Sequence, residues 1–365
     1  TLQQALQTVA GVSPVNFGRR GFDDLNIRGF RSTESIYVDG LMTSGWMWRL
    51  IPYGYERVEV LKGASSILYG QVQPGGLVNA ISKSPKGEPF AEATFEVGSY
   101  GHRSLGLDLN RPLSDSGRAA FRINAYALNS DDPVDAVWRR DRWIAPSLSL
   151  DLGPATRFTL FATHMEAKWI RMQGTSPYGT VLPNQNGRLP LDRFTGDPSF
   201  GPYDVRSDSV GYAFEHRFDS GLRLRQGVRY EEQKGIGRFI ALQGAPREGQ
   251  RLQNRSASLQ DIDYNILATD SSLQMDLATG ALTHRLVAGL DARTGKSDQA
   301  NTSCRVSPLD LFNPRYGDPI TCPTTPTTHA PSRLTVWGLY LQDQIKLGEN
   351  WTALLGLRHD RSPAR

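Results

Sequence analysis

The stretch KGASSILYGQVQPGGLVNAISKSP, from Lys62 to Pro85, combines residue types that seldom share so short a segment. Its glycines, at positions 63, 70, 75 and 76, and its prolines, at 74 and 85, indicate several tight turns. Between them stand side chains apolar enough to require a core, namely Ile67, Leu68, Leu77, Val78 and Ile81. A turn-rich segment of this kind has to be covered by other parts of the chain.

The residues around this stretch predict a small unit of mixed α/β structure over residues 1–87. Thr1 and Gln4 fit a capping box, Gly11 fits a helix stop, and one helical face is apolar, with Leu2, Leu6 and Val9. Short strands are predicted over residues 26–28, 35–38, 56–61 and 77–82. Residues 64–69 fit a single helical turn that ends at Gly70.

Residues 88–365 follow a different pattern, in which long segments alternate between apolar and polar side chains. Within residues 222–231 one parity is mainly apolar, with Leu222, Leu224, Val228 and Tyr230. The other parity is mainly charged, with Arg223, Arg225, Arg229 and Glu231. A soluble β-sandwich also alternates in this way, so the period alone does not separate it from a membrane barrel.

The connectors between these segments favour a barrel. From the third connector onward, tight turns of about three residues alternate with loops of about 13 to 40 residues, among them residues 168–206, 235–261 and 295–332. Strands of about 10 to 15 residues can cross an apolar band of about 25 Å. We count about eleven such strands, and because an open edge in lipid leaves backbone groups unpaired, we expect the remaining strands after Arg365.

Composition excludes several other classes of protein. The 36 glycines and 22 prolines suit an all-β chain with many turns, and the net charge of +4 comes from Lys and Arg interspersed with Asp and Glu. No nucleic-acid-binding motif accompanies these charges. The six histidines form no HExxH motif, no GxSxG motif is present, and residues 289–295 have five residues between two glycines where a Walker A loop has four. The sequence therefore predicts no enzyme.

Two cysteines, Cys304 and Cys322, lie in a segment rich in Pro, Thr, Asn and Asp. We expect them to form a disulfide that closes a polar loop in an oxidising compartment. The alternative is a pair of buried free thiols, but the polar surroundings argue against burial.

Five motifs in the first 85 residues occur in the order found in one family. They are IRGF at residues 27–30, YVDG at 37–40, PYGYERVEVLKG at 52–63, SILYG at 66–70 and PGGLVN at 74–79. Together they resemble the plug domain of TonB-dependent outer-membrane receptors, and their form resembles the ferric-siderophore branch of ferrichrome and hydroxamate type. The resemblance implies that residues 1–87 are most of a plug and that residues 88–365 are the first half of an antiparallel transmembrane barrel of about 22 strands. The residues it marks as structural are Gly63, Tyr69, Gly70, Pro74, Gly75, Gly76 and Asn79, and we expect Gly70, Gly75 and Gly76 to adopt positive φ.

The resemblance also implies a function. Such a receptor lies as a monomer among outer-membrane lipids of a Gram-negative bacterium, captures a ferric siderophore on the outside, and imports it with energy relayed by TonB, ExbB and ExbD. The TonB box would precede Thr1, and the chain begins without a signal peptide. Iron would enter only within the chelate, with no cofactor on the protein. Another cargo (cobalamin, a glycan or haem) and an additional signalling role remain alternatives.

By the same resemblance, Arg28, Trp46, Trp48 and Tyr53 correspond to ligand-binding positions at the apex of the plug. A cation suits an anionic or carbonyl-rich chelate, and aromatic faces suit its organic shell. The alternatives are an ion pair with the barrel for Arg28 and packing against the wall for the aromatic residues. Arg57, Glu59 and Lys62 resemble a charge lock between plug and wall. Four aromatic residues remain as either vestibule or membrane-interface residues, namely Trp138, Trp169, Tyr178 and Tyr203.

Overall fold

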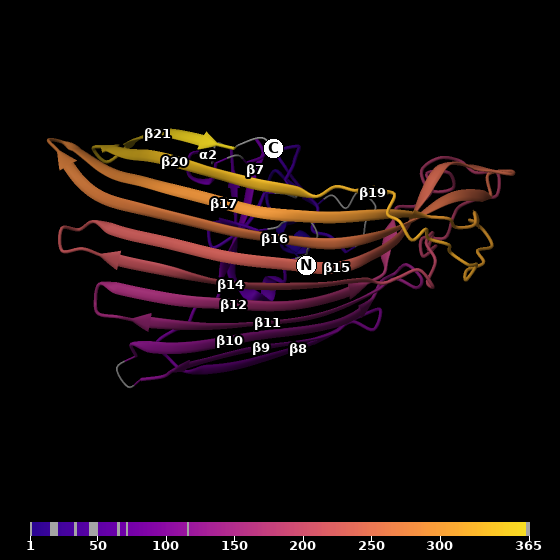
Figure 1. The fold of residues 1–365 in the computed structure, drawn as a ribbon, viewed down its shortest axis with the longest axis horizontal. Helices are drawn as coiled ribbons and strands as arrows, with labels where there is room; N and C mark the ends of the chain where they lie inside the picture. Colours follow the sequence, from indigo (N-terminus) through magenta and orange to yellow (C-terminus); the bar gives the residue numbers. More distant parts are fainter. Residues whose placement is uncertain are drawn as a thin grey trace.

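The computed structural model describes residues 2–14, 21–32, 35–43, 50–63, 66–70, 72–114 and 117–362. It consists of a long curved sheet and a smaller body, the plug, on one side of it (Figure 1). The plug contacts strands from one end of the sheet to the other: Tyr53 lies against Gly106 near the first edge, and Ile67 lies against Gly356 in the last strand. The sheet therefore curves around the plug, and its inward face is the one that touches the plug.

The plug is built from short elements. They are α1 (Leu2–Leu6), β1 (Val12–Pro14), β2 (Leu25–Ile27), β3 (Phe30–Arg31), β4 (Ile36–Val38), β5 (Leu41–Met42), the 3-10 helix η1 (Pro52–Gly54), β6 (Tyr55–Lys62), α2 (Ser66–Tyr69) and β7 (Gly76–Ser82). The strands form two sheets, ordered β1-β2-β3 and β5-β4-β7-β6. A shared core joins the sheets to α1, with Leu2, Leu6, Val12, Leu25, Ile27 and Val78.

The predicted elements of the plug lie within a residue or two of the observed ones, but the first helix is shorter than predicted. It ends at Leu6, and the chain then turns twice, with Val9 N–H donating to the Leu6 carbonyl at 3.0 Å and Val12 N–H to the Val9 carbonyl at 3.0 Å. Val9 still packs on the core from this turn. The predicted N-cap, Thr1, lies outside the described residues.

The large sheet, the wall, contains eleven long antiparallel strands paired in chain order, as the sequence predicts. They are β8 (Phe90–Val97), β9 (Arg103–Pro112), β10 (Ala119–Asp131), β11 (Trp138–Asp151), β12 (Thr156–Trp169), β14 (Tyr203–Arg217), β15 (Arg223–Arg247), β16 (Leu252–Thr279), β17 (Leu282–Cys304), β20 (Ser332–Leu347) and β21 (Trp351–Arg361). Three short strands pair beside this path, namely β13 (Arg171–Gln173), β18 (Leu309–Asp310) and β19 (Thr328–His329). In the described chain β8 and β21 are the two edges, so the barrel is incomplete.

The two ends of the wall differ. One end, the turn rim, carries the connectors at residues 113–118, 152–155, 218–222, 280–281 and 348–350 (Figure 1, left). The other end, the loop rim, carries residues 132–137 and the long loops 174–202 and 305–331 (Figure 1, right). The predicted alternation of short and long connectors is therefore present.

One predicted long loop is wrong. Residues 235–261 belong mostly to β15 and β16, which contain 25 and 28 residues and meet only at residues 248–251. Two glycines in this range have a packing role within the paired strands. A Cβ on Gly237 would lie 2.5 Å from the Tyr203 ring, and a Cβ on Gly235 would lie 2.5 Å from the Asp204 carbonyl oxygen. The hairpin of β15 and β16 therefore extends beyond the other strands at the loop rim (Figure 1).

The two faces of the wall carry different side chains because successive residues of a strand point to opposite faces. Buried polar residues such as Arg122 and Asn124 face the plug, whereas Leu105, Leu109 and Leu160 face outward and are exposed. Among the described residues, no helix has both the length and the apolar composition needed to cross a membrane.

Candidate functional site

Plug and wall meet at an aromatic box near the loop rim. Phe22, in the segment before β2, is 2% exposed, and its ring meets Trp169 edge to face at 5.7 Å and Tyr203 at 5.9 Å. Trp169 and Tyr203 stack on each other at 4.9 Å. Such edge-to-face pairs are favourable geometries, so the box fixes this plug segment against β12 and β14.

A guanidinium closes the box from the wall. Arg171 lies over the Phe239 ring at 3.7 Å and over the Phe22 ring at 5.1 Å. Its Nη1 donates to the Tyr203 hydroxyl at 2.6 Å, and that hydroxyl donates to Gln260. A cation stacked on desolvated rings adds attraction beyond apolar contact. Trp169 and Tyr203 are thus plug contacts, and neither the vestibule nor the membrane-interface prediction holds for them, because both side chains point inward and are almost fully buried.

A cluster of charges forms a second junction, near the turn rim. Arg122 of β10 donates to both carboxylate oxygens of Asp108 at 2.8 and 2.7 Å, and its Nη1 lies 3.3 Å from Glu56 of the plug. Lys83 completes the pairing of Asp108 at 2.9 Å, and Lys86 donates to Glu56 at 3.0 Å. The hydrogen bond from Lys86, with the nearby Arg122 charge, lowers the pKa of Glu56 below its ordinary value despite partial burial.

The chain that leaves the plug is tied to the wall at the same place. Lys86 N–H donates to Asn110 Oδ1 at 2.9 Å, and Asn110 Nδ2 donates to the carbonyls of Lys86 at 2.9 Å and Glu88 at 2.6 Å. Arg122 Nη1 also donates to the Ser84 carbonyl at 2.9 Å. Residues 83–89, the linker, are therefore fixed to β9 and β10 through backbone and side-chain bonds.

The structure places the predicted ligand residue Tyr53 against the wall. Its ring stacks on Tyr126 at 5.8 Å, and the Lys83 ammonium lies 4.3 Å from the ring centroid. A Cβ on Gly106 would lie 2.5 Å from this ring, so Gly106 makes room for Tyr53. The packing alternative describes this position, and a ligand role for Tyr53 stays a prediction.

Arg28 lies in the turn between β2 and β3, with φ of 51°. Its backbone N–H donates to the Gly11 carbonyl at 2.7 Å, and its side chain is exposed. Gly63 lies beside it, because a Cβ there would be 3.1 Å from Arg28 Nη1. An exposed guanidinium on a fixed turn suits contact with a ligand. The other predicted apex residues, Trp46 and Trp48, lie outside the described residues.

The three residues predicted to lock plug and wall interact within the plug. Arg57 Nε donates to Glu59 Oε1 at 2.7 Å, and Asn79 Nδ2 donates to Glu59 Oε2 at 3.3 Å. Lys62 Nζ donates to the Ala10 carbonyl. No wall partner of these three is found among the described residues, whereas Glu56, which immediately precedes Arg57, does reach the wall. A lock at Arg57, Glu59 and Lys62 therefore stays a prediction.

The motif residues of the plug have structural surroundings. Gly63, Gly70 and Gly76 have φ of 91°, 69° and 132°. Gly75 is different: it is not in the positive-φ region, so that expectation is wrong, and it is needed for space because a Cβ would lie 1.9 Å from the Ile27 carbonyl oxygen. Pro74 lies in the same turn.

Tyr69 and Asn79 hold neighbouring turns of the plug together. Tyr37 meets the Tyr69 ring edge to face at 5.2 Å and donates to its carbonyl at 3.2 Å. The Asn79 side chain, which is 3% exposed, accepts from Gly40 N–H at 3.0 Å. Both residues therefore fix the second sheet of the plug.

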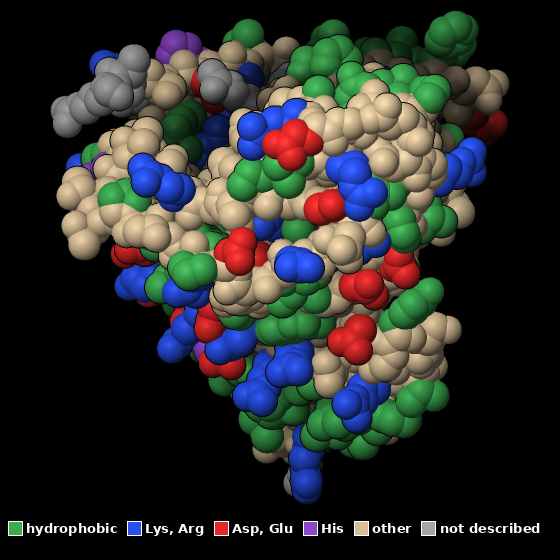
Figure 2. All heavy atoms as spheres, turned by 90° about the vertical axis from the view of Figure 1, so that its right-hand side faces the viewer, with side chains coloured by type: hydrophobic (Ala, Val, Ile, Leu, Met, Phe, Trp, Pro, Cys, Tyr) green, Lys and Arg blue, Asp and Glu red, His purple; other side chains and the backbone are tan. Residues whose placement is uncertain are grey.

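The long loops at the loop rim form a cross-linked unit, the loop platform, of residues 174–202, 248–251 and 305–331. Arg255 donates to the carbonyls of Gly196 at 2.6 Å and Ser307 at 3.0 Å, which joins two of the loops. The Tyr316 hydroxyl donates to the Phe194 carbonyl at 2.7 Å. Positive and negative side chains are interspersed over this end of the molecule (Figure 2).

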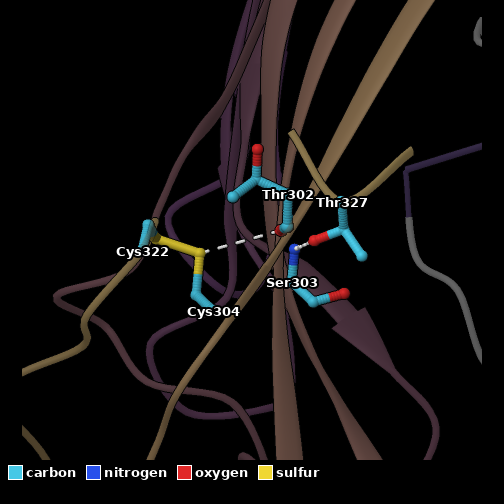
Figure 3. Close-up of a disulfide and its surroundings, with 5 residues drawn as sticks. All are labelled: Thr302, Ser303, Cys304, Cys322 and Thr327. Carbon is cyan, nitrogen blue, oxygen red and sulfur yellow. Dashed lines mark hydrogen bonds between the residues drawn. A yellow bond between two sulfur atoms is a disulfide. The ribbon is translucent and has the colours of Figure 1, made fainter. Parts of the chain in front are cut away.

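A disulfide joins Cys304 and Cys322 at the base of the third loop (Figure 3). Cys304 is only 6% exposed and packs with Ile240 and Ala257, so the expected absence of burial is wrong for this residue. The polar loop covers a small apolar cluster that its own composition does not reveal. Beside the bridge, Ser303 N–H donates to Thr327 Oγ1 at 2.8 Å (Figure 3).

The residues that sequence reasoning missed are Phe22 and Glu56. Phe22 stands outside the family motifs, and no spacing in the sequence pairs it with Trp169. Glu56 belongs to the PYGYERVE motif. Because neighbouring residues of β6 face opposite sides, the alternation of this strand could have indicated that Glu56 and Arg57 point in different directions. Among the described residues, no group of three or more His, Cys, Asp or Glu side chains is placed to hold a metal ion.

Two family descriptions match the chain. "TonB-dependent Receptor Plug Domain" matches residues 1–77, and "TonB dependent receptor-like, beta-barrel" matches residues 149–365, which is more than half of the chain.

Curated relatives match nearly the whole chain. The ferrioxamine B receptor of Salmonella typhimurium strain SL1344 is 30% identical over 373 residues, which cover 99% of this chain and 52% of that protein. The ferrichrome outer membrane transporter/phage receptor of Escherichia coli strain K12 is 29% identical over 395 residues, with 99% and 52% covered. The metal-pseudopaline receptor CntO of Pseudomonas aeruginosa strain PAO1 is 32% identical over 311 residues, with 84% and 43% covered. The chain spans about half the length of the curated relatives it matches.

A solved structure with the same fold is the ferric-catecholate import receptor Fiu from E. coli K12 in its open form. It has a TM-score of 0.86 and 23% identity, and the match covers 98% of this chain and 56% of that one. At this identity the likeness shows the fold alone. The family matches and the plug held against the inward face of a β-barrel wall agree, and the chain belongs to the TonB-dependent receptor family.

Proposed function

We propose that the whole receptor imports a ferric siderophore across the outer membrane of a Gram-negative bacterium. In this proposal the wall spans the membrane, the loop rim faces outward, and the ligand binds between the loop platform and the plug. TonB, with ExbB and ExbD, supplies energy through a segment that precedes the plug. The iron belongs to the chelate, so the protein needs no cofactor, and the receptor acts as a monomer.

The observation that carries the proposal is the plug, around which the wall curves from β9 to β21 and which the wall holds at two junctions. In a complete barrel, a plug held in this way would admit a ligand only if it moves, and we propose that the energy for this movement comes from outside the chain. The relatives named as receptors for ferrioxamine B and ferrichrome support a hydroxamate siderophore as cargo. Arg28 and the two tryptophans Trp46 and Trp48 are the contacts that we propose for it.

Binding to the full-length receptor tests the cargo. Purified receptor in detergent is titrated with ferrioxamine B and ferrichrome in ferric and metal-free forms, with quenching of tryptophan fluorescence as the readout. We expect saturable binding of a ferric form and much weaker binding of its metal-free form. Saturable binding of cobalamin, haem or a glycan, with no response to any ferric chelate, would overturn the assignment.

The Arg28 contact has its own test. Arg28→Gln removes a charge-assisted hydrogen bond, so we expect about a tenfold or larger loss of affinity for the ferric chelate. Arg285→Gln is the matched control, because Arg285 belongs to the wall and pairs with Asp276 near the turn rim. Equal affinities for wild type and Arg28→Gln would remove Arg28 from the site while leaving the receptor proposal in place.

A second cargo class is a metal chelate of another kind. The relative named metal-pseudopaline receptor, 32% identical over 311 residues, is the specific observation in its favour. The same titration with metal-loaded pseudopaline separates the two candidates. Uptake of radioactive iron into cells with and without TonB then tests energy coupling independently of which chelate binds.

A further inference from the structure

The outward face of the wall carries a groove of about 660 Å³ near the loop rim, across β9 to β12. Its lining includes four cationic side chains, Arg103, Arg140, Arg142 and Lys168. They point away from the plug, because each strand alternates: Arg139 reaches the Gly21 carbonyl on the inward face, and Arg140 and Arg142 therefore point outward.

Strand pairing arranges these cations in two adjacent rows. Arg103 pairs with Asn129, Asn129 with Arg140, and Arg140 with Lys168, which makes one row across four strands. Arg142 lies two residues further along β11, between Ala127 and Glu166 in the next row. The positive charges are therefore concentrated within one patch.

Most of the positive charge in this patch has no carboxylate partner among the residues that the structure describes. Within the described part of the chain, the three arginines form no ion pair, and Arg140 lies over the Trp138 ring at 4.7 Å. Lys168, by contrast, pairs with Asp204 of β14 at 2.7 Å. Two carboxylates line the groove, and one of them, Asp141, pairs inward with Arg139 at 2.5 Å. The patch thus carries an excess of positive charge.

The same row continues beyond Glu166 to Arg206 and Lys234, and there the cations are neutralised. Arg206 pairs with Asp208 at 2.6 Å, and Lys234 pairs with Glu232 at 2.7 Å. The contrast with the groove therefore rests on Arg103, Arg140 and Arg142, which have no carboxylate partner among the described residues, whereas Lys168 is paired like Arg206 and Lys234.

Apolar surface begins directly beside the cations. Leu105 and Ile144 point outward and are 43% and 38% exposed, and both lie in or next to the row of Arg142. From Arg142 to Leu152 the chain advances about 33 Å, or about 25 Å along the axis of a barrel whose strands are tilted by ~40°. This distance equals the height of a membrane-spanning apolar band, so the cations lie at its upper edge.

We propose that this groove binds the phosphorylated headgroup of a lipid in the leaflet on the loop side, with Arg140 and Arg142 holding phosphate. Guanidinium groups bind phosphate through two parallel hydrogen bonds, and the adjoining leucine and isoleucine surface receives the acyl chains. That continuous apolar surface selects a lipid over free phosphate. The proposal rests on the membrane placement proposed above and not on the identity of the cargo.

Lipid retention by the full-length receptor tests the site. The receptor in detergent is mixed with bisphosphorylated lipid A, and bound lipid is counted by native mass spectrometry. We expect Arg140→Gln/Arg142→Gln to weaken binding about tenfold or more. The matched control, Arg206→Gln/Lys234→Gln, removes two cations from the same level of the wall and is expected to change affinity less than about twofold.

Each other outcome overturns the site. Unchanged binding by Arg140→Gln/Arg142→Gln, or an equal loss with the control, would show that the groove is not the lipid site. Inorganic phosphate that competes at the same concentration as lipid A would show a simple anion site. Siderophore titration of the same variants is expected to match the wild type. A failure of the lipid-site proposal can therefore be distinguished from a failure of the cargo proposal.

Discussion

Arg122 of the wall lies 3.3 Å from Glu56 of the plug while it holds both carboxylate oxygens of Asp108. The Arg122 and Asp108 side chains are each 3% exposed, whereas the Glu56 side chain is 39% exposed. The buried pair therefore belongs to the wall, and the plug docks onto its accessible side.

Replacement of the two partners of this contact is expected to have unequal effects. Arg122→Met leaves the Asp108 charge buried with Lys83 as its remaining cation, and we expect a loss of about 3–5 kcal/mol in the free energy of unfolding. Glu56→Gln removes only a half-exposed pair, with an expected loss of about 0.5 kcal/mol. Denaturant melts of the full-length receptor in detergent compare the two, and equal losses would contradict the asymmetry.

The Glu56 contact is also expected to depend on pH. Its pKa is lowered in the folded protein, so its stabilisation is present above the ordinary pKa of 4.5 and is lost as pH falls through the folded value. The difference in melting temperature between wild type and Glu56→Gln should be constant from pH 7 down to about pH 5 and should vanish once the pH has fallen below the lowered folded-state pKa. A difference that grows on acidification would contradict this sign.

Phe22→Ala is expected to release the first segment of the plug from the wall. The substitution empties the aromatic box, and loss of a buried Phe side chain costs about 3–5 kcal/mol. Hydrogen exchange of β2 amides measures the effect, with Val181→Ala as control because Val181 is 84% exposed in the loop platform. Unchanged exchange in Phe22→Ala would mean that the box does not hold the plug.

Gly75→Ala is expected to prevent normal packing of β2 in the plug. The new Cβ would meet the Ile27 carbonyl oxygen at 1.9 Å, and because this is a backbone atom, no side-chain rotation relieves the clash. A cost of about 1–3 kcal/mol or more is expected. Gly87→Ala is the matched control, since nothing lies within 4 Å of a Cβ there, and its melting temperature should equal the wild-type value.

Reduction of the Cys304–Cys322 bridge is expected to loosen the third loop of the platform. An 18-residue separation corresponds to about 3 kcal/mol of loop-closure entropy. The ion pair between Arg251 and Asp310, at 3.0 Å, still holds the loop base. Proteolytic cleavage within residues 305–321 should accelerate in reduced wild type and in Cys304→Ser/Cys322→Ser alike, and equal resistance before and after reduction would contradict the expectation.

Much of the fold follows from the sequence because local patterns determine it. Alternation and turn chemistry locate the eleven wall strands, and the plug motifs locate β4, β6 and β7. The prediction fails where the role of a residue depends on a contact with a residue far away in the sequence. Gly237 lies within the predicted loop of residues 235–261, but it makes room for the Tyr203 ring in a paired strand, and no local pattern reveals that contact.

The candidate site is less predictable for the same reason. Trp169 and Tyr203 stand near strand ends, where aromatic residues often lie at a membrane interface. Their inward direction depends on the parity of the strand relative to the plug, and Phe22, which they enclose, is about 150 residues away along the chain. The burial of Cys304 was unpredictable for the same reason, since its neighbours Ile240 and Ala257 belong to other strands.

The attachment of linker residues 83–89 to β9 and β10 decides how a mechanical load would pass through the plug. A pull applied at the N-terminal end first meets α1, then β1 and β2, which share three paired positions, and only later the seven-residue β7. Asn110 and Arg122 lie beyond both, so tension reaches them last. A mechanical load would therefore unfold the plug from its N-terminal end while its C-terminal end stays attached to the wall. Refolding could start from this attached end once the load is released.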